Sequence, residues 1–194
     1  DKLEEGMYEL LGKACLDACR AILKRNLTIT YTNPAIMDVY VTIVCGELFD
    51  RRDLVDYGTK KLNEIYYHVM DAQTFDEYNC PGYSLLIANI FSIMLRHIEN
   101  VDIQKKVNVL NNIVWTMLGK HYHNKTGEFA GPNLRQYGNF ISARELSVYR
   151  RAIGMDVLSE NEVCYDLMDV VYDVKCPTEL KHLFLEDKSV DSKV

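Results

Sequence analysis

The sequence predicts an all-α protein, built as an array of antiparallel helical hairpins, and two observations support this fold class. The first is the near-regular placement of the four prolines, which are separated by 47, 51 and 45 residues at Pro34, Pro81, Pro132 and Pro177. Proline is tolerated at the first position of a helix, where its missing N–H would be unpaired anyway. The interval suits two helices and two loops, so each proline marks the expected start of a hairpin.

The second observation is the helical spacing of the apolar residues. A first helix is predicted over 3–25, where leucine, methionine, alanine and isoleucine recur at intervals of three and four. A second helix begins at Pro34, is capped by Asn33 and runs to about Phe49. A third starts near Arg52.

The same pattern then recurs along the chain. A fourth helix is predicted from Pro81 to Ile98, and a fifth over 102–120. Placing Pro34 on Pro81 superposes the apolar positions of the second and third helices on those of the fourth and fifth. The sequence therefore predicts a repeated hairpin, and because no heptad persists it does not predict a coiled coil.

The C-terminal third is less regular. A glycine-containing loop is expected first, then two helices, a short helix opened by a proline, and a charged tail that frays. These segments are 121–142, 143–153, 159–173, 177–185 and 186–194. We expect a single α-hairpin domain over 1–185.

Composition argues against two classes of partner. The net charge of −6 argues against a nucleic-acid partner, which needs a basic face. No segment is long and apolar enough to suggest a membrane span or a signal peptide, so no membrane partner is expected. Because the chain begins at Asp1 rather than methionine, loss of an upstream segment is one expectation.

The six cysteines contain no Cys-x-x-Cys pair and their spacing suits no zinc site, so we expect no metal and no cofactor. His121 and His123 would point in different directions from a helix, which argues against a metal there too. Most of the cysteines lie in apolar surroundings, which favours a reducing compartment and a cytoplasmic location.

Two predicted loops, 75–83 and 127–138, concentrate polar side chains. Loops held by a rigid scaffold are the usual place for binding and catalysis, and in a hairpin array both loops lie at the same end. Their polar groups can therefore converge on one cavity. The candidate residues are Glu77, Tyr78, Asn79 and Tyr83 in the first segment, and Glu128, Asn133, Arg135 and Tyr137 in the second.

Four short motifs, taken in order, resemble a known group of proteins. They are Thr32-Asn33-Pro34, Glu77-Tyr78-Asn79-x-Pro81-x-Tyr83, Ala130-Gly131-Pro132-x-x-Arg135-x-Tyr137 and Cys176-Pro177-x-Glu179-Leu180. This order resembles large bacterial and fungal proteins that are similar to the (α/α) toroid carbohydrate enzymes, namely the six-hairpin glycosidases and the heparinase and alginate lyase superfamily. The resemblance covers about 28–185.

The resemblance implies a partial (α/α) toroid, because a full toroid needs more helices than the seven or eight predicted. The chain would then be a fragment lacking a flanking domain, an open arc, or half of an oligomer. In the second loop the group has His and Ser where this chain has Asn133 and Leu134.

The resemblance also implies a saccharide substrate and two possible chemistries. In a lyase, Arg135 with Asn79 or Asn133 would bind the substrate carboxylate. Tyr137 or Tyr83 would move protons. In a hydrolase, Glu77 and Glu128 would form the pair of carboxylates, with Tyr78 contacting the sugar.

Structural roles compete with these functional ones. Glu77 can favour a helix N-terminus through the dipole, and Asn79 can cap the helix that Pro81 begins. Arg135 can tie a loop carbonyl or carboxylate, and Tyr83 can belong to the core. The sequence thus leaves two functions open: a carbohydrate-processing domain with its cleft at the two loops, or a non-catalytic helical scaffold that binds a protein or peptide.

Overall fold

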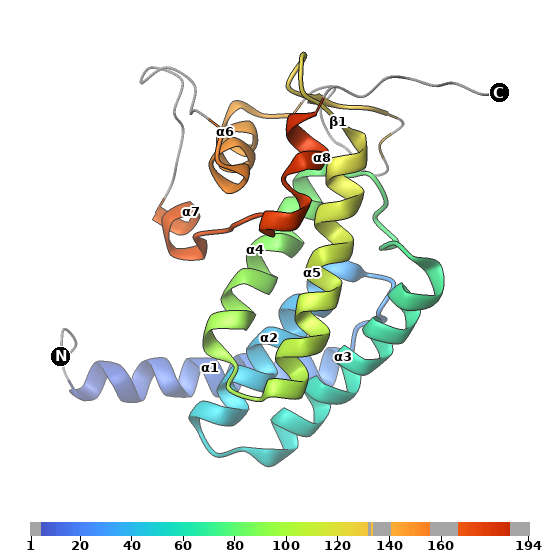
Figure 1. The fold of residues 1–194 in the computed structure, drawn as a ribbon. Helices are drawn as coiled ribbons and strands as arrows, with labels where there is room; N and C mark the ends of the chain where they lie inside the picture. Colours follow the sequence, from blue (N-terminus) through green and yellow to red (C-terminus); the bar gives the residue numbers. More distant parts are fainter. Residues whose placement is uncertain (1–4, 132, 134–140, 156–166, 187–194) are drawn as a thin grey trace.

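The computed structural model describes residues 5–131, 133, 141–155 and 167–186, which are mainly α-helical (Figure 1). The predicted all-α class is therefore confirmed. In chain order the elements are α1 (Glu5–Arg25), α2 (Thr32–Leu48), α3 (Arg52–Ala72), α4 (Pro81–His97), α5 (Val101–His121), β1 (Tyr122–His123), β2 (Glu128–Phe129), α6 (Ala143–Ile153), α7 (Leu167–Tyr172), the 3-10 helix η1 (Thr178–Leu180) and α8 (His182–Leu185).

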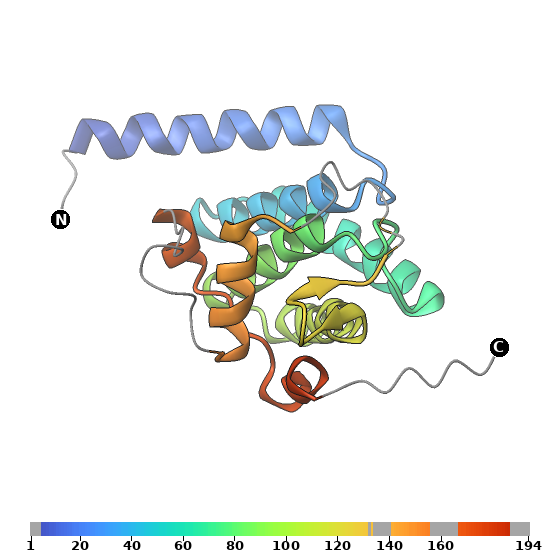
Figure 2. The same ribbon diagram turned by 90° about the horizontal axis from the view of Figure 1, so that it is seen from above.

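The centre of the molecule consists of two helical hairpins. Helices α2 and α3 form the first, and α4 and α5 form the second (Figure 1). In each hairpin the first helix has 17 residues and the second has 21, as expected for a repeated unit. Helix α2 also packs on α4, and α3 packs on α5, so the four helices surround a common core (Figure 2).

This core forms because apolar side chains recur at helical spacing on the inner faces. Ile43 and Leu62 of the first hairpin are at most 1% exposed, and Phe91 and Leu110 of the second are fully buried. Burying a side chain of this size contributes roughly 1.5–3 kcal/mol relative to leaving it in water. The hairpins are therefore held together mainly by these contacts.

The C-terminal helices cover one end of the hairpins. The indole of Trp115, on α5, packs edge-on against Tyr149 of α6 and Phe184 of α8, with ring centroids 6.1 and 5.8 Å away. The hydroxyl of Tyr149 donates a 2.5 Å hydrogen bond to the carbonyl of Pro81, the first residue of α4. Helix α6 thus closes over the start of α4.

Helix α1 lies outside the four-helix core and contacts α2 (Figure 2). Cys19 of α1 packs with Cys45 of α2 and Leu54 of α3 in a separate small cluster. At its end, the Arg25 guanidinium donates a 2.6 Å hydrogen bond to the buried carboxylate of Asp38. The C-terminal half of α1 is therefore the half that is anchored.

The prediction that each proline marks the start of a helix is confirmed at some positions and is wrong at another. Pro81 begins α4 as predicted, and Pro177 immediately precedes η1. The second helix instead begins at Thr32, so Pro34 is its third residue and Asn33 lies inside the helix, 4% exposed, and does not cap it. The first turn of a helix has no i–4 partners for its N–H groups, which is why proline is tolerated beyond the first position. Pro132 lies outside the described residues.

The predicted loop 121–142 also contains short strands that the sequence did not indicate. Tyr122 pairs with Phe129 and His123 with Glu128 in a small antiparallel ladder. Gly127, with φ of +70°, permits the turn between them. Of the helix predicted over 159–173, the described part is α7.

Candidate functional site

The two polar segments predicted to converge do meet in their described parts. The side-chain amide of Asn79 donates a 2.6 Å hydrogen bond to the carbonyl of Ala130. Asn79 is 3% exposed and has a left-handed backbone, with φ of +49°, which asparagine tolerates better than most residues. This contact joins the segment before α4 to the segment after β2.

The residues predicted in the first segment have mostly inward positions. Glu77 is 4% exposed, and Tyr83 is half-buried on the first turn of α4. Cys80, and not Asn79, occupies the N-cap position of α4, so the interpretation of Asn79 as a cap is wrong. Its side chain is used for the bond to Ala130 instead.

The ionisable groups near the start of α4 are not chemically activated. Burial raises the pKa of the Cys80 thiol, and it raises that of the Tyr149 hydroxyl well above its usual value. A thiol with a raised pKa is a poor nucleophile at neutral pH. Neither group is therefore activated for catalysis, and the Tyr149 hydroxyl instead holds α6 against the start of α4.

Fewer residues of the second segment can be placed. Glu128 is half-buried on β2, and its carboxylate accepts a 3.4 Å hydrogen bond from the N–H of Ile141. Asn133 is half-buried. Arg135 and Tyr137 lie outside the described residues, so the roles predicted for them remain predictions.

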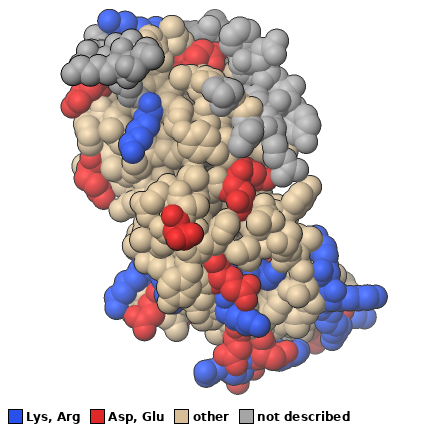
Figure 3. Space-filling model, turned by 90° about the vertical axis from the view of Figure 1, so that its right-hand side faces the viewer, with Lys and Arg blue, Asp and Glu red and all other residues tan. Residues whose placement is uncertain are grey.

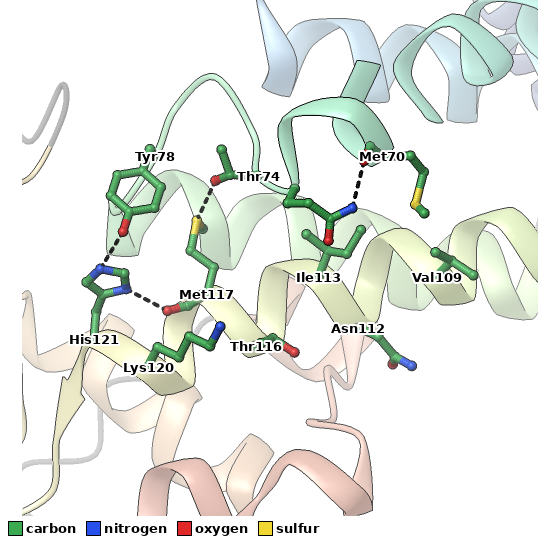
Figure 4. A pocket seen from close by; sticks show the side chains of 11 residues that line it. Met70, Thr74, Tyr78, Val109, Asn112, Ile113, Thr116, Met117, Lys120 and His121 are labelled. Atoms are coloured by element: carbon green, nitrogen blue, oxygen red, sulfur yellow. Dashed lines mark hydrogen bonds between the residues drawn. The ribbon is translucent and has the colours of Figure 1, made fainter. Parts of the chain in front are cut away.

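A groove of about 450 Å³ lies between the C-terminal part of α3, the segment that follows it, and α5 (Figure 4). Of the predicted site residues that the structure describes, only Tyr78 lines it. The other lining residues are Met70, Gln73, Thr74, Val109, Asn112, Ile113, Thr116, Met117, Lys120 and His121.

One face of α5 supplies most of this lining. The residues recur at intervals of three and four from Val109 to His121, which is the spacing of a single helical stripe. Val109, Ile113 and Met117 make the stripe apolar, whereas Asn112 and Thr116 run beside them. The stripe follows the part of α5 where α3 leaves its side (Figure 1).

The sequence pattern does not separate this stripe from the core for a definite reason. The predicted repeat gives the helix over 102–120 one apolar face, directed toward the core, and therefore no separate groove. The sequence does carry one indication of this stripe. The apolar residues of α5 span a wider arc than packing against the core needs, since Val107, Leu110 and Val114 already face the core. A wide arc indicates a helix with a second contact surface.

A tyrosine–histidine pair closes one end of the groove (Figure 4). Nδ1 of His121 lies 2.8 Å from the carbonyl oxygen of Met117, so this nitrogen carries the hydrogen and donates it. Nε2 is then the acceptor for the Tyr78 hydroxyl, 2.7 Å away. The two rings also pack edge-on with centroids 5.2 Å apart.

The opposite wall is held by α3 and its C-terminus. The side chain of Gln73 donates a 2.6 Å hydrogen bond to the carbonyl of Met70, and Thr74 donates to the sulfur of Met117 at 3.5 Å. Gln73 has a left-handed backbone that ends α3. The wall is therefore preformed at the point where it meets α5.

Neither a metal site nor a membrane segment is found in the part of the chain that the structure describes. No three His, Cys, Asp or Glu side chains there are grouped so that they could hold an ion. None of the helices in the described ranges combines the length and the apolar character that crossing a bilayer requires.

Fold and site together define an all-α hairpin protein with an open, largely apolar groove. The chain belongs to the family described as "Domain of unknown function (DUF8769)", whose model matches residues 2–174. Comparison with curated proteins finds no match, and comparison with solved structures finds none either. The resemblance to toroid carbohydrate enzymes therefore remains a prediction.

Proposed function

We propose that this protein is a non-catalytic binding module whose α3–α5 groove holds an amphipathic helix of a partner protein. The observation that carries this proposal is the α5 side of the groove, where Val109 is 37% exposed and Ile113 is half-buried, while Met117, which is 6% exposed, also packs into the core. Of the two functions that the sequence left open, this is the helical scaffold.

The dimensions of the groove support a helical ligand. From Val109 to His121 the stripe is about 18 Å long, or slightly more than three helical turns. A partner helix would present apolar residues at i, i+3 or i+4, and i+7, the spacing used when helices bind in grooves.

The chemistry of the lining indicates the side chains that fit. Met70 and Met117 have flexible, polarisable side chains that adapt to different apolar surfaces. Lys120 is the one charged side chain among the lining residues in the described ranges, apart from the titratable His121. The partner helix is therefore expected to carry a carboxylate near this end of the groove.

The surrounding surface is consistent with a contact area. Figure 3 shows the side of the molecule on which α3 lies: uncharged side chains make up most of its middle, with a few acidic side chains among them, and Lys, Arg, Asp and Glu gather toward its lower end. Interface centres are depleted in charged residues relative to the rest of a protein surface.

The positions of the predicted acids favour binding over catalysis. A general acid or nucleophile must reach the substrate, but Glu77 is 4% exposed and neither Glu77 nor Glu128 lines the groove. One observation still favours a saccharide as a second candidate ligand. The Tyr78 ring is 39% exposed at the end of a groove that Asn112 and Thr116 also line with polar side chains, an arrangement that can bind a sugar without cleaving it.

Selection from a randomised peptide library tests the proposal. Selected peptides should share the i, i+3/i+4, i+7 apolar pattern and carry an acidic residue near one end. Val109→Lys, which places a charge in the groove, should weaken their binding by roughly a hundredfold or more, or about 3 kcal/mol.

Val101→Lys is the matched control, because Val101 is also exposed on α5 but lies outside the groove. It should leave peptide affinity unchanged. Equal effects of the two variants on every selected peptide would contradict the proposal. Retention on a glycan array that Val109→Lys abolishes would instead support the saccharide candidate.

A further inference from the structure

The apolar side chains of α1 span a wider arc of the helix than the face that packs on α2. Cys15, Cys19 and Ile22 face the bundle, and the last two are less than 9% exposed. A second row of apolar side chains lies on the adjacent side of the same helix and is exposed. Its members are Met7, Leu10, Leu11, Ala14, Ala18 and Ala21.

This second row faces away from the bundle. At 100° per residue its members fall within a single arc, and the centre of that arc lies roughly 130° from the centre of the face that contacts α2. Figures 1 and 2 show α1 on the outside of the molecule, with its N-terminal part extending past the other helices. Met7, Leu10 and Leu11 are 45%, 70% and 50% exposed, which is unusual for such a group on one helix.

The sizes of these side chains are ordered along the helix. The bulky members, Met7, Leu10 and Leu11, occupy the N-terminal half, and the three alanines occupy the C-terminal half. Such a surface is complementary to itself when two copies run antiparallel. With the two Ala14 residues opposite each other, Leu10 of one copy lies opposite Ala18 of the other, and Met7 lies opposite Ala21.

We propose that α1 pairs antiparallel with α1 of a second copy of this chain, about a two-fold axis at Ala14. The contact is isologous, so Met7 and Leu10 of one copy each pack on an alanine of its partner and the reverse contacts are made as well. Leu11 lies at the level of Asp17 of the partner, between Ala14 and Ala18. Alanines at the crossing let the helix backbones approach closely. This surface is independent of the α3–α5 groove.

The charged residues beside the apolar row favour the same antiparallel alignment. Lys13 and Asp17 lie on one flank of α1, both exposed. In the antiparallel pair this flank faces its own copy, which brings Asp17 of each chain within one helical turn of Lys13 of the other. Two reciprocal pairs of opposite charge result, whereas in a parallel pair this flank would face the other flank of the partner helix.

The dimer should be of modest affinity. A 21-residue helix is about 32 Å long, and contact along one helix covers less than the roughly 800 Å² per partner of a standard stable interface. Dissociation in the micromolar range is therefore expected.

Light scattering coupled to size exclusion, over a concentration series, tests the association. The mass should rise with concentration from 22.4 kDa toward twice that value. Leu10→Asp should keep the protein monomeric throughout, with an unchanged circular dichroism spectrum. Leu48→Asp is the matched control, because Leu48 is also 70% exposed but lies at the end of α2. The Leu48→Asp protein should dimerise as the wild type does.

Introduced cysteines test the register under glutathione disulfide, in a Cys15→Ser, Cys164→Ser background whose remaining cysteines are buried. Ala14→Cys should form a covalent dimer with itself. Ala18→Cys should form none alone, but should cross-link to Leu10→Cys when the two proteins are mixed, because only facing residues come within disulfide distance. A monomer at every concentration would overturn the proposal, and so would equal effects of the two aspartate variants. Self-cross-linking of Ala18→Cys without that of Ala14→Cys would also overturn it.

Discussion

Asn79 illustrates how a single residue type can serve several purposes that only its surroundings distinguish. An asparagine two residues before a helix-starting proline is compatible with a cap or with a ligand-binding amide. In the structure it is buried, has a left-handed backbone and donates to the carbonyl of Ala130, 51 residues further along the chain. It is a tie between two segments.

The substitution Asn79→Ala should therefore lower the free energy of unfolding by about 1.5–3.5 kcal/mol. Roughly 0.5–1.5 kcal/mol comes from the lost hydrogen bond, because Ala130 is exposed and its carbonyl can bind water instead, and about 1–2 kcal/mol comes from alanine in a left-handed conformation. Urea unfolding followed by circular dichroism measures the loss.

Asn79→Gly separates the two causes, because glycine also lacks the amide but accepts the backbone conformation without strain. It should cost less than Asn79→Ala. If both variants unfold at the wild-type urea concentration, the bond to Ala130 does not stabilise the fold.

Glu77 and Tyr78 show the limit of motif-based assignment at the same scale. The two residues are adjacent, yet Glu77 is 4% exposed and Tyr78 is 39% exposed and reaches the groove. A motif shows that polar groups are close in sequence. It does not show which of them faces solvent, because that depends on how the segment lies against α5 and α6.

Among the elements, α6 is the one whose bounds agree fully with the sequence prediction, at 143–153. Its ends carry strong local signals. Ser142 and Glu145 form a capping box at the start, and Gly154, with φ of +80°, ends the helix. Helix α2 begins two residues earlier than predicted because no comparable signal marks its start: its N-cap, Tyr31, makes no side-chain bond.

Ser142→Ala should destabilise the protein by about 1 kcal/mol, within a range of roughly 0.5–2 kcal/mol, because an N–H of the first turn loses its acceptor. Thermal unfolding should show a lower midpoint. Ser142→Gly should cost only a few tenths of a kcal/mol. An alanine variant as stable as wild type would mean that α6 is held by Tyr149 and its neighbours alone.

The two central hairpins set the stability of the whole molecule, because their core is shared by α2, α3, α4 and α5. Met94 lies in this core and is 1% exposed. It belongs to the fourth helix predicted from Pro81 to Ile98, and its burial agrees with the apolar spacing predicted for that helix.

Met94→Asp should abolish cooperative folding or cost roughly 3–5 kcal/mol, because it buries an unpaired charge. Met37→Asp is the control, since Met37 is 46% exposed on α2 and should be tolerated. Circular dichroism and urea unfolding compare the two. A folded Met94→Asp protein with wild-type stability would mean that the core does not depend on this position.

The amino-acid sequence by itself determined the helices, the repeated hairpin and the approach of the segment before α4 to the segment after β2. The helices and hairpins follow from local causes, because apolar spacing, caps, glycines and short connections act between residues a few positions apart, and the approach of the two segments follows from the repeat of the hairpin. Only the tertiary structure decided which apolar faces remain uncovered, namely the α5 stripe beside α3 and the outer row of α1. A helix presents the same periodicity whether its apolar face meets another helix or solvent, so coverage depends on the relative placement of helices that are distant in sequence.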